Sequence, residues 1–140
     1  MPDIVNPIPQ EMSRKFSQSE LRWFEDVRRI LNFVTGLGEI KVLTDAASID
    51  TDGRYNHYFK VTLEGNRTLA NPTNLTIGNT YYWIIIQDGT GSRTLAYGSS
   101  FDFPGGSAPV LSTGAGDIDL LTGVVLSSTQ ILATMTKDHV

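Results

Sequence analysis

The sequence predicts a mainly β protein, an antiparallel β-sandwich or barrel of the jelly-roll kind, preceded by an extended arm and one α-helix. Prolines mark the first residues, and a single later segment repeats apolar side chains at helical spacing. About seven short segments then alternate between apolar and polar residues or are apolar throughout, with turns rich in Gly, Asn and Asp between them. We therefore expect an arm over residues 1–16, a helix over 17–37 and a β domain over 38–140.

The arm is predicted from Pro2, Pro7 and Pro9, because proline favours extended backbone and blocks a helix. Apolar side chains stand between these prolines, as is common in arms that dock on another chain. The residues that we expect to make such a contact are Ile4, Val5, Pro7, Ile8 and Pro9. A frayed terminus is the alternative explanation of the same segment.

The helix is predicted to begin at Ser17, whose hydroxyl can cap it, with Glu20 completing a capping box three residues later. Neither Pro nor Gly interrupts it until Gly36. Its apolar residues form two heptad-like stripes that together cover a wide face. The residues of this face that we expect to meet sister chains are Trp23, Phe24, Val27, Ile30, Leu31 and Val34. Packing on the chain's own β domain is the alternative.

Period-two alternation follows the helix. It begins over residues 39–43 and is clearest over 54–64, where one face carries Tyr55, His57, Phe59, Val61 and Leu63. An Asp50-Thr51-Asp52-Gly53 turn separates these two segments.

The later strands are predicted from apolar runs and from hairpin signals. Residues 80–87 are apolar on both faces, so we expect this strand at the centre of a sheet or at a subunit interface. The turn sequence Asp88-Gly89-Thr90-Gly91 predicts 93–97 as its antiparallel return strand. A last hairpin is expected to join 117–126 to 130–136.

Composition excludes several classes of protein. The absence of Cys excludes disulfides, thiolate metal sites and a cysteine nucleophile. A formal charge of −4 provides no basic field for nucleic acid. The longest apolar run, residues 81–86, is far shorter than the roughly 20 residues that span a bilayer. Charges are sparse after Gly65, and a β surface that is polar but uncharged is typical of packing between copies.

We expect no catalytic, cofactor-binding or metal-binding residues, and therefore no enzyme. His57 lies among aromatic residues on an alternating strand, which favours a packed, hydrogen-bonded side chain. The aspartates Asp45, Asp50 and Asp52 lack the distal Glu of a calcium loop, and turn chemistry explains them more simply.

An aromatic group offers one binding alternative. Aromatic rings can stack on the apolar face of a sugar, and the group consists of Tyr81, Tyr82, Trp83 and Tyr97. Core or interface packing is the favoured explanation, because the neighbours 84–86 are all Ile.

Five sequence blocks over residues 69–140 occur in a recognisable order and spacing. They are Leu69-Ala70-Asn71-Pro72-Thr73-Asn74-Leu75, Gly78-Asn79-Thr80-Tyr81, Gln87-Asp88-Gly89-Thr90-Gly91-Ser92-Arg93-Thr94-Leu95, Phe103-Pro104-Gly105-Gly106 and Asp119-Leu120-Leu121-Thr122. This half of the chain resembles the small β domain of fibre, tail and head-decoration proteins of tailed bacteriophages. The resemblance implies a homotrimeric structural protein of the virion, assembled in the host bacterial cytoplasm, with its N-terminal part attached to the particle.

The length of 140 residues is short for a phage fibre, which favours a capsid decoration (cement) or short head-fibre protein that stabilises the particle. Its expected partners are two further copies of itself and other virion proteins, above all the major capsid protein, with no nucleic acid and no membrane. The alternative is a tail-fibre receptor-binding tip that recognises a host surface glycan, for which exposed aromatics near Tyr97 or Phe101 would be needed. A glycan depolymerase is the third alternative.

Overall fold

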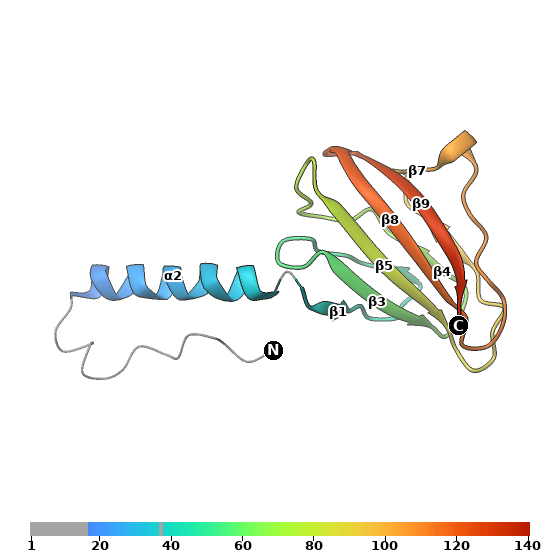
Figure 1. Ribbon diagram of the computed structural model, residues 1–140, viewed down its shortest axis with the longest axis horizontal. Helices are drawn as coiled ribbons and strands as arrows, with labels where there is room; N and C mark the ends of the chain where they lie inside the picture. The colour runs from blue at the N-terminus through green and yellow to red at the C-terminus, as the bar shows by residue number, and fades with distance from the viewer. Residues whose placement is uncertain (1–16, 37) are drawn as a thin grey trace. The chain divides into compact units, whose positions relative to one another are not determined.

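The computed structural model describes residues 17–36 and 38–140 and divides after Glu39 into a helical unit and a β unit (Figure 1). The helical unit contains α2, Gln18–Gly36. The capping box is confirmed, because the Glu20 amide donates to the Ser17 hydroxyl at 3.3 Å and the Ser17 amide donates to the Glu20 carboxylate at 2.7 Å. The pKa of Glu20 lies below its ordinary value, mainly because its carboxylate accepts from the Ser17 hydroxyl and secondly because it accepts from the Ser17 amide.

Two sheets form the β unit (Figure 1). The larger sheet has the strand order β1-β3-β5-β8-β9-β7, with bounds β1 Ile40–Val42, β3 Tyr58–Leu63, β5 Thr80–Gln87, β7 Phe101–Asp102, β8 Ile118–Ser127 and β9 Gln130–His139. The smaller sheet has the order β2-β4-β6, with bounds β2 Ser48–Ile49, β4 Arg67–Leu69 and β6 Leu95–Tyr97. A short 3-10 helix, Pro104–Gly106, follows β7.

The core lies between the two sheets. Ile49 and Leu69 of the smaller sheet belong to the same hydrophobic cluster as Phe59, Trp83 and Leu121 of the larger one, and each of the five is at most 1% exposed. Burial of these side chains is the main stabilising contribution, about 1.5–3 kcal/mol for a fully buried large apolar residue. The predicted class, a mainly β fold preceded by one helix, is therefore confirmed.

The strand pairing is mixed, and so differs from the antiparallel arrangement that the sequence predicts. The pairs β5–β8 and β8–β9 are antiparallel, whereas β1–β3, β3–β5, β2–β4, β4–β6 and β7–β9 are parallel. The first six strands alternate between the two sheets, so the chain winds round the core and returns to each sheet in the same direction. Alternation of apolar residues marks a strand but does not say in which direction its neighbour runs.

The prediction of a hairpin across residues 88–91 is also wrong. β5 lies between β3 and β8, as its apolar character on both faces predicts, so no edge of β5 is left for a return strand. Residues 95–97 instead form β6 in the smaller sheet, parallel to β4. The last hairpin, β8 to β9, is confirmed.

Gln87 and Asp88 direct the chain out of the larger sheet. Gln87 is only 3% exposed, and its side chain donates to the Arg93 carbonyl and accepts from the Arg93 amide, both at 2.9 Å. The Asp88 carboxylate contacts the Arg93 guanidinium at 2.7 Å. The hydrogen bonds from this guanidinium are the largest cause that lowers the pKa of Asp88, to about 2, and the hydrogen bonds from the amides of Gly91 and Thr90 add to it. Side chains thus take the place of the backbone ladder of a hairpin.

Candidate functional site

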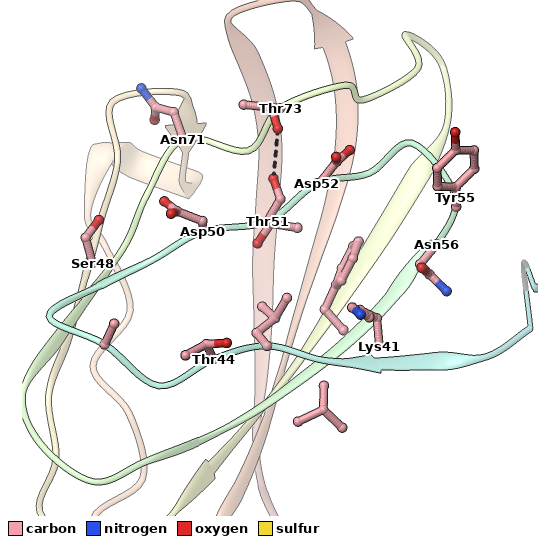
Figure 2. Close-up of a pocket in the computed structure, with 14 residues that line it drawn as sticks. Lys41, Thr44, Ser48, Asp50, Thr51, Asp52, Tyr55, Asn56, Asn71 and Thr73 are labelled. Atoms are coloured by element: carbon pink, nitrogen blue, oxygen red, sulfur yellow. Dashed lines mark hydrogen bonds between the residues drawn. The ribbon is translucent and has the colours of Figure 1, made fainter.

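A groove of about 860 Å³ opens in the β unit between β1 and the segment that carries β2 (Figure 2). Polar side chains dominate its lining, together with the rings of Tyr55 and Phe59. The lining residues are Lys41, Val42, Leu43, Thr44, Ala46, Ser48, Asp50, Thr51, Asp52, Tyr55, Asn56, Phe59, Asn71 and Thr73. They come from strands of both sheets and from the loops between them, so the winding of the chain is what builds the groove.

Backbone bonds and one core side chain hold the central segment of the groove in place. Thr73 donates from its amide to the Thr51 carbonyl at 2.9 Å and from its hydroxyl to the same carbonyl at 3.3 Å (Figure 2). The Gly53 amide donates back to the Thr73 carbonyl at 2.9 Å. From the core, the indole nitrogen of Trp83 donates to the Thr51 hydroxyl at 3.0 Å. A buried Trp therefore positions a residue of the groove.

Gly53 lets this segment pass close to the core. A Cβ at this position would lie 3.0 Å from a ring carbon of Tyr81 and closer still to the end of the Leu75 side chain. The turn predicted over residues 50–53 does not form, because this segment runs beside Thr73 and Asp52 pairs with it; the close approach to Tyr81 is what requires a glycine at 53.

The groove carries charges of both signs. Lys41 extends from β1 on the same side as Asn56, and Asp50 lies at the other end near Ser48 (Figure 2). The Asp52 carboxylate accepts from the Arg54 amide and from the Asn74 side-chain amide, each at 3.0 Å. These two bonds, in that order, hold the pKa of Asp52 below its ordinary value, so it is an ionised hydrogen-bond acceptor at neutral pH.

Tyr55 supplies an aromatic ring at the end of the groove (Figure 2). It is 51% exposed, and the Arg54 guanidinium carbon lies 5.8 Å from its ring centre. The prediction that Tyr55 shares a strand face with Phe59 and Val61 is wrong, because β3 begins only at Tyr58. The His57 carbonyl accepts from the Tyr82 amide at 2.8 Å, so regular pairing starts there and the residues just before it contribute to the groove wall.

An aromatic ring beside hydroxyl, amide and carboxylate groups is the chemistry that contacts a saccharide, whose rings have an apolar face and many hydroxyls. Sequence reasoning missed this set because most of its polar members lie in loop segments, where Asp, Asn, Ser and Thr have ordinary structural uses. The available signal was the density of such residues over 44–56.

Two rings of the aromatic group proposed as a sugar platform belong to the core. Tyr81 and Trp83 are at most 1% exposed, so the favoured packing explanation is confirmed for them, whereas Tyr82 and Tyr97 are half-buried. Phe101, near which exposed aromatics were expected for a glycan-binding tip, is 7% exposed. Tyr97 contacts the Phe103 ring at a centroid distance of 4.8 Å. Burial, and to a smaller extent the charge of Asp119, raises the pKa of the Tyr97 hydroxyl. His57 is packed as predicted, since it stacks on Tyr81 at 4.4 Å and its Nδ1 lies 3.1 Å from the Thr80 carbonyl.

The helix residues predicted to meet sister chains lie along α2. Trp23 and Ile30 are each 61% exposed and Leu31 is 40% exposed, while Phe24 and Val27 are half-buried. The side chain of Val34 lies outside the described residues. The predicted attachment residues of the arm also lie outside them, namely Ile4, Val5, Pro7, Ile8 and Pro9.

Within residues 17–36 and 38–140, no group of three His, Asp or Glu side chains is arranged to hold a metal ion. In the same part, α2 is neither long nor apolar enough to cross a membrane.

Comparison with known families gives one match. A family model described as "Putative phage tail fibre C-terminal domain" matches residues 45–129, which is more than half of the chain. The matched range runs from the loop before β2 to the β8–β9 turn and so contains most of the groove. Searches among curated proteins and among solved structures gave no match.

Proposed function

The chain belongs to the phage tail fibre C-terminal domain family, and on this premise we propose that it forms a homotrimeric fibre displaying its β unit on the particle. As a member of this family it is a structural component of the phage virion. The proposal is that three copies associate through the apolar face of α2 and that residues 4–9 attach them to the particle. It acts by binding and assembly, without catalysing a reaction.

The exposed apolar face of α2 is the observation that carries this proposal. Trp23 and Ile30 are each 61% exposed, and a single helix has no core of its own in which to bury them. Isolated helices of this size are only marginally stable in water, so most of their stability comes from packing. Three copies of α2 packed along these stripes would bury both residues, and the heptad-like spacing suits such a bundle.

We expect Ile30→Glu to weaken trimer formation at least about 30-fold, because a charge at the centre of an apolar interface costs about 2 kcal/mol or more. The dissociation constant follows from sedimentation equilibrium of the full chain, and helix content from circular dichroism. Arg22→Gln is the matched control, since it makes the same change in charge at an exposed position of α2. A trimer that Ile30→Glu leaves unchanged would contradict the role of α2.

The proposed trimer could be mounted on the tail or on the head of the virion. The family match supports a tail fibre, whereas the length of the chain led us to expect a capsid decoration or cement protein bound to the major capsid protein. The same trimer serves either purpose, since only the surface that receives residues 4–9 differs. Density for the β unit in a reconstructed virion, on the head or on the tail, tests this directly.

The groove favours a second candidate function, a receptor-binding tip that recognises a host surface glycan. The favouring observation is the exposed Tyr55 ring near Asn56 at one end of the groove, with the hydroxyls of Thr44 and Ser48 further along it (Figure 2). Hydroxyl-rich ligands are bound by polar groups of this kind together with one stacking surface. The nearly balanced charges of Lys41, Asp50 and Asp52 suit a neutral or zwitterionic sugar.

If the groove binds a glycan, we expect Tyr55→Ala to weaken binding to host-surface polysaccharide about tenfold, since loss of ring stacking costs up to about 1.5 kcal/mol. Binding is measured by calorimetry with polysaccharide purified from the host. Tyr55→Phe is the control, because it keeps the ring and removes only the hydroxyl. Equal binding by the wild type and Tyr55→Ala, with an unchanged melting temperature, would remove the groove as the glycan site.

A further inference from the structure

We infer that the outer face of the larger sheet is a second interface between copies of this chain. The outer face is defined as the side chains of β1, β3, β5, β8 and β9 that point away from the core. The inference rests on the proposed homotrimer and deepens it, because it names a surface in the β unit that acts independently of α2.

Strand register assigns the outer face without ambiguity. Along β5, Tyr81, Trp83 and Ile85 are buried in the core, so the residues between them point outward. Their partners on neighbouring strands must point the same way, because paired residues share a face. The resulting rows are Ile40-Tyr58-Tyr82-Thr122-Thr134, Val42-Lys60-Ile84-Leu120-Thr136, Thr62-Ile86-Ile118-His139 and Thr80-Val124-Leu132.

The rows are apolar to a degree that is unusual for a surface facing water. Within them Lys60 is the one Lys, Arg, Asp or Glu, and the remaining polar members are threonines, two tyrosines and His139 at the end of one row. Asp102 of β7, which pairs with Leu132, adds one negative charge at the edge of the face. Val42 is 63% exposed, Leu132 48% and Val124 43%, so apolar side chains reach the surface at both sides of the sheet. Antiparallel and mixed sheets that leave one face in water normally carry polar residues on it. A continuous apolar face of this kind marks a protein–protein contact.

The size of the outer face matches one side of an ordinary interface. The rows hold 17 positions, which at about 4.8 Å between strands and about 6.7 Å along them give a flat area of about 550 Å². Each partner in a standard protein–protein interface contributes about 800 Å², measured over the relief of its side chains. The outer face is therefore large enough to hold two copies together.

A hollow of about 400 Å³ at one side of the face gives a place for a side chain of the second copy. Its apolar lining includes Val124 and Leu132 from the rows, with Phe103 and Pro104 from the chain before and within the 3-10 helix. Large side chains that fill such hollows contribute most of the energy of an interface. On β3 and β5, the rings of Tyr58 and Tyr82 stack with their centroids 4.9 Å apart and form an aromatic surface on the same face.

The chemistry of the face points to a second copy as its occupant. With one positive charge, Lys60, among the rows and one negative charge, Asp102, at their edge, the face offers little electrostatic complementarity to a strongly charged partner. Two copies meet on it without extended repulsion between like charges. The second half of the chain is poor in charged residues generally, as expected when copies pack side by side in a fibre.

The test compares self-association of full-length variants by sedimentation equilibrium. The double variant Val124→Glu, Leu132→Glu should weaken association at least about 100-fold, because two charges would be buried in the interface. Both positions are solvent-accessible in a lone subunit, so an unchanged circular dichroism spectrum is expected. The melting temperature should fall only slightly, because the two Glu side chains lie directly opposite each other on β8 and β9 and repel. Val110→Glu is the matched control, since Val110 is 73% exposed and lies outside the rows; its association should equal that of the wild type.

The outcomes separate this inference from the proposed function. If the double variant associates like the wild type while Ile30→Glu does not, the outer face is no interface and the trimer through α2 stands. A wild-type chain that remains monomeric would overturn both. If the double variant weakens association and Ile30→Glu does not, the outer face is supported and α2 is not.

Cross-linking identifies the occupant without relying on a charged variant. The chain has no Cys, so Leu132→Cys introduces a single reactive thiol. A thiol-to-photoreactive cross-linker attached there should yield dimers and trimers whose linked peptides come from β3, β5, β8 or β9 of another copy. Links to α2 would make the helix the occupant of the face, and links within one chain alone would show no contact between copies. Either result would overturn the inference.

Discussion

Trp83→Ala is expected to lower the free energy of unfolding of the β unit by about 3–5 kcal/mol, the range for removing a large buried aromatic side chain. Trp83 is 1% exposed, and its ring contacts Phe101 and Phe59 at centroid distances of 5.5 and 5.8 Å. Gly123 lies beside it, where a Cβ would approach the indole to 3.2 Å, so no neighbouring side chain can move in from that position to fill the cavity. Chemical denaturation followed by tyrosine fluorescence measures the loss.

Trp83→Phe separates packing from hydrogen bonding. It keeps most of the ring contacts but removes the indole donor that bonds the Thr51 hydroxyl at 3.0 Å. We expect a smaller loss of stability than for Trp83→Ala, and faster amide exchange at the groove segment around Thr51. A Trp83→Ala protein with wild-type stability would mean that this ring is not the centre of the core.

Local features were predictable from the sequence because their causes are local. The capping box of α2 depends on residues three apart, and the inner face of β3 follows from the alternation of Phe59, Val61 and Leu63, which are all buried. The β8–β9 hairpin joins segments separated by two residues, so few alternatives compete with it.

The direction of strand pairing and the groove were not predictable in this way. Whether 95–97 return to β5 or cross to β4 depends on β8, which occupies the edge of β5 from more than twenty residues further along the chain. The groove likewise depends on the bonds from Thr73 to the Thr51 carbonyl, which join segments 22 residues apart. Both depend on contacts between distant residues, for which a single sequence carries no direct signal.

Asp119→Ala is expected to destabilise the β unit by at least about 3 kcal/mol, because it leaves several buried donors without an acceptor. Asp119 is 2% exposed. Its carboxylate accepts from the amide and the hydroxyl of Ser112 at 2.7 and 2.8 Å, and from the Asp138 amide at 2.9 Å. Thermal and denaturant unfolding of the purified variant measure the effect.

Two further variants identify the cause. Asp119→Asn keeps the size and one acceptor oxygen but turns an NH₂ group toward a donor, so an intermediate loss is expected. Asp117→Ala is the control nearby, since Asp117 is only half-buried and its bond to the Gly114 amide lies in an exposed turn. If Asp117→Ala cost as much as Asp119→Ala, burial of the acceptor would not be the reason.

The location of Asp119 explains why its loss should also affect assembly. It lies at an irregularity in the β8–β9 register, between the Ile118 and Leu120 pairs, and ties the loop around Ser112 to the end of β9. Ile118 and Leu120 flank Asp119 and belong to the outer face. The Asp119 carboxylate, which points to the core, therefore fixes the spacing between these two apolar side chains. We therefore expect Asp119→Asn to weaken self-association even where the subunit remains folded. Unchanged association in that variant would show that the outer face does not depend on this register.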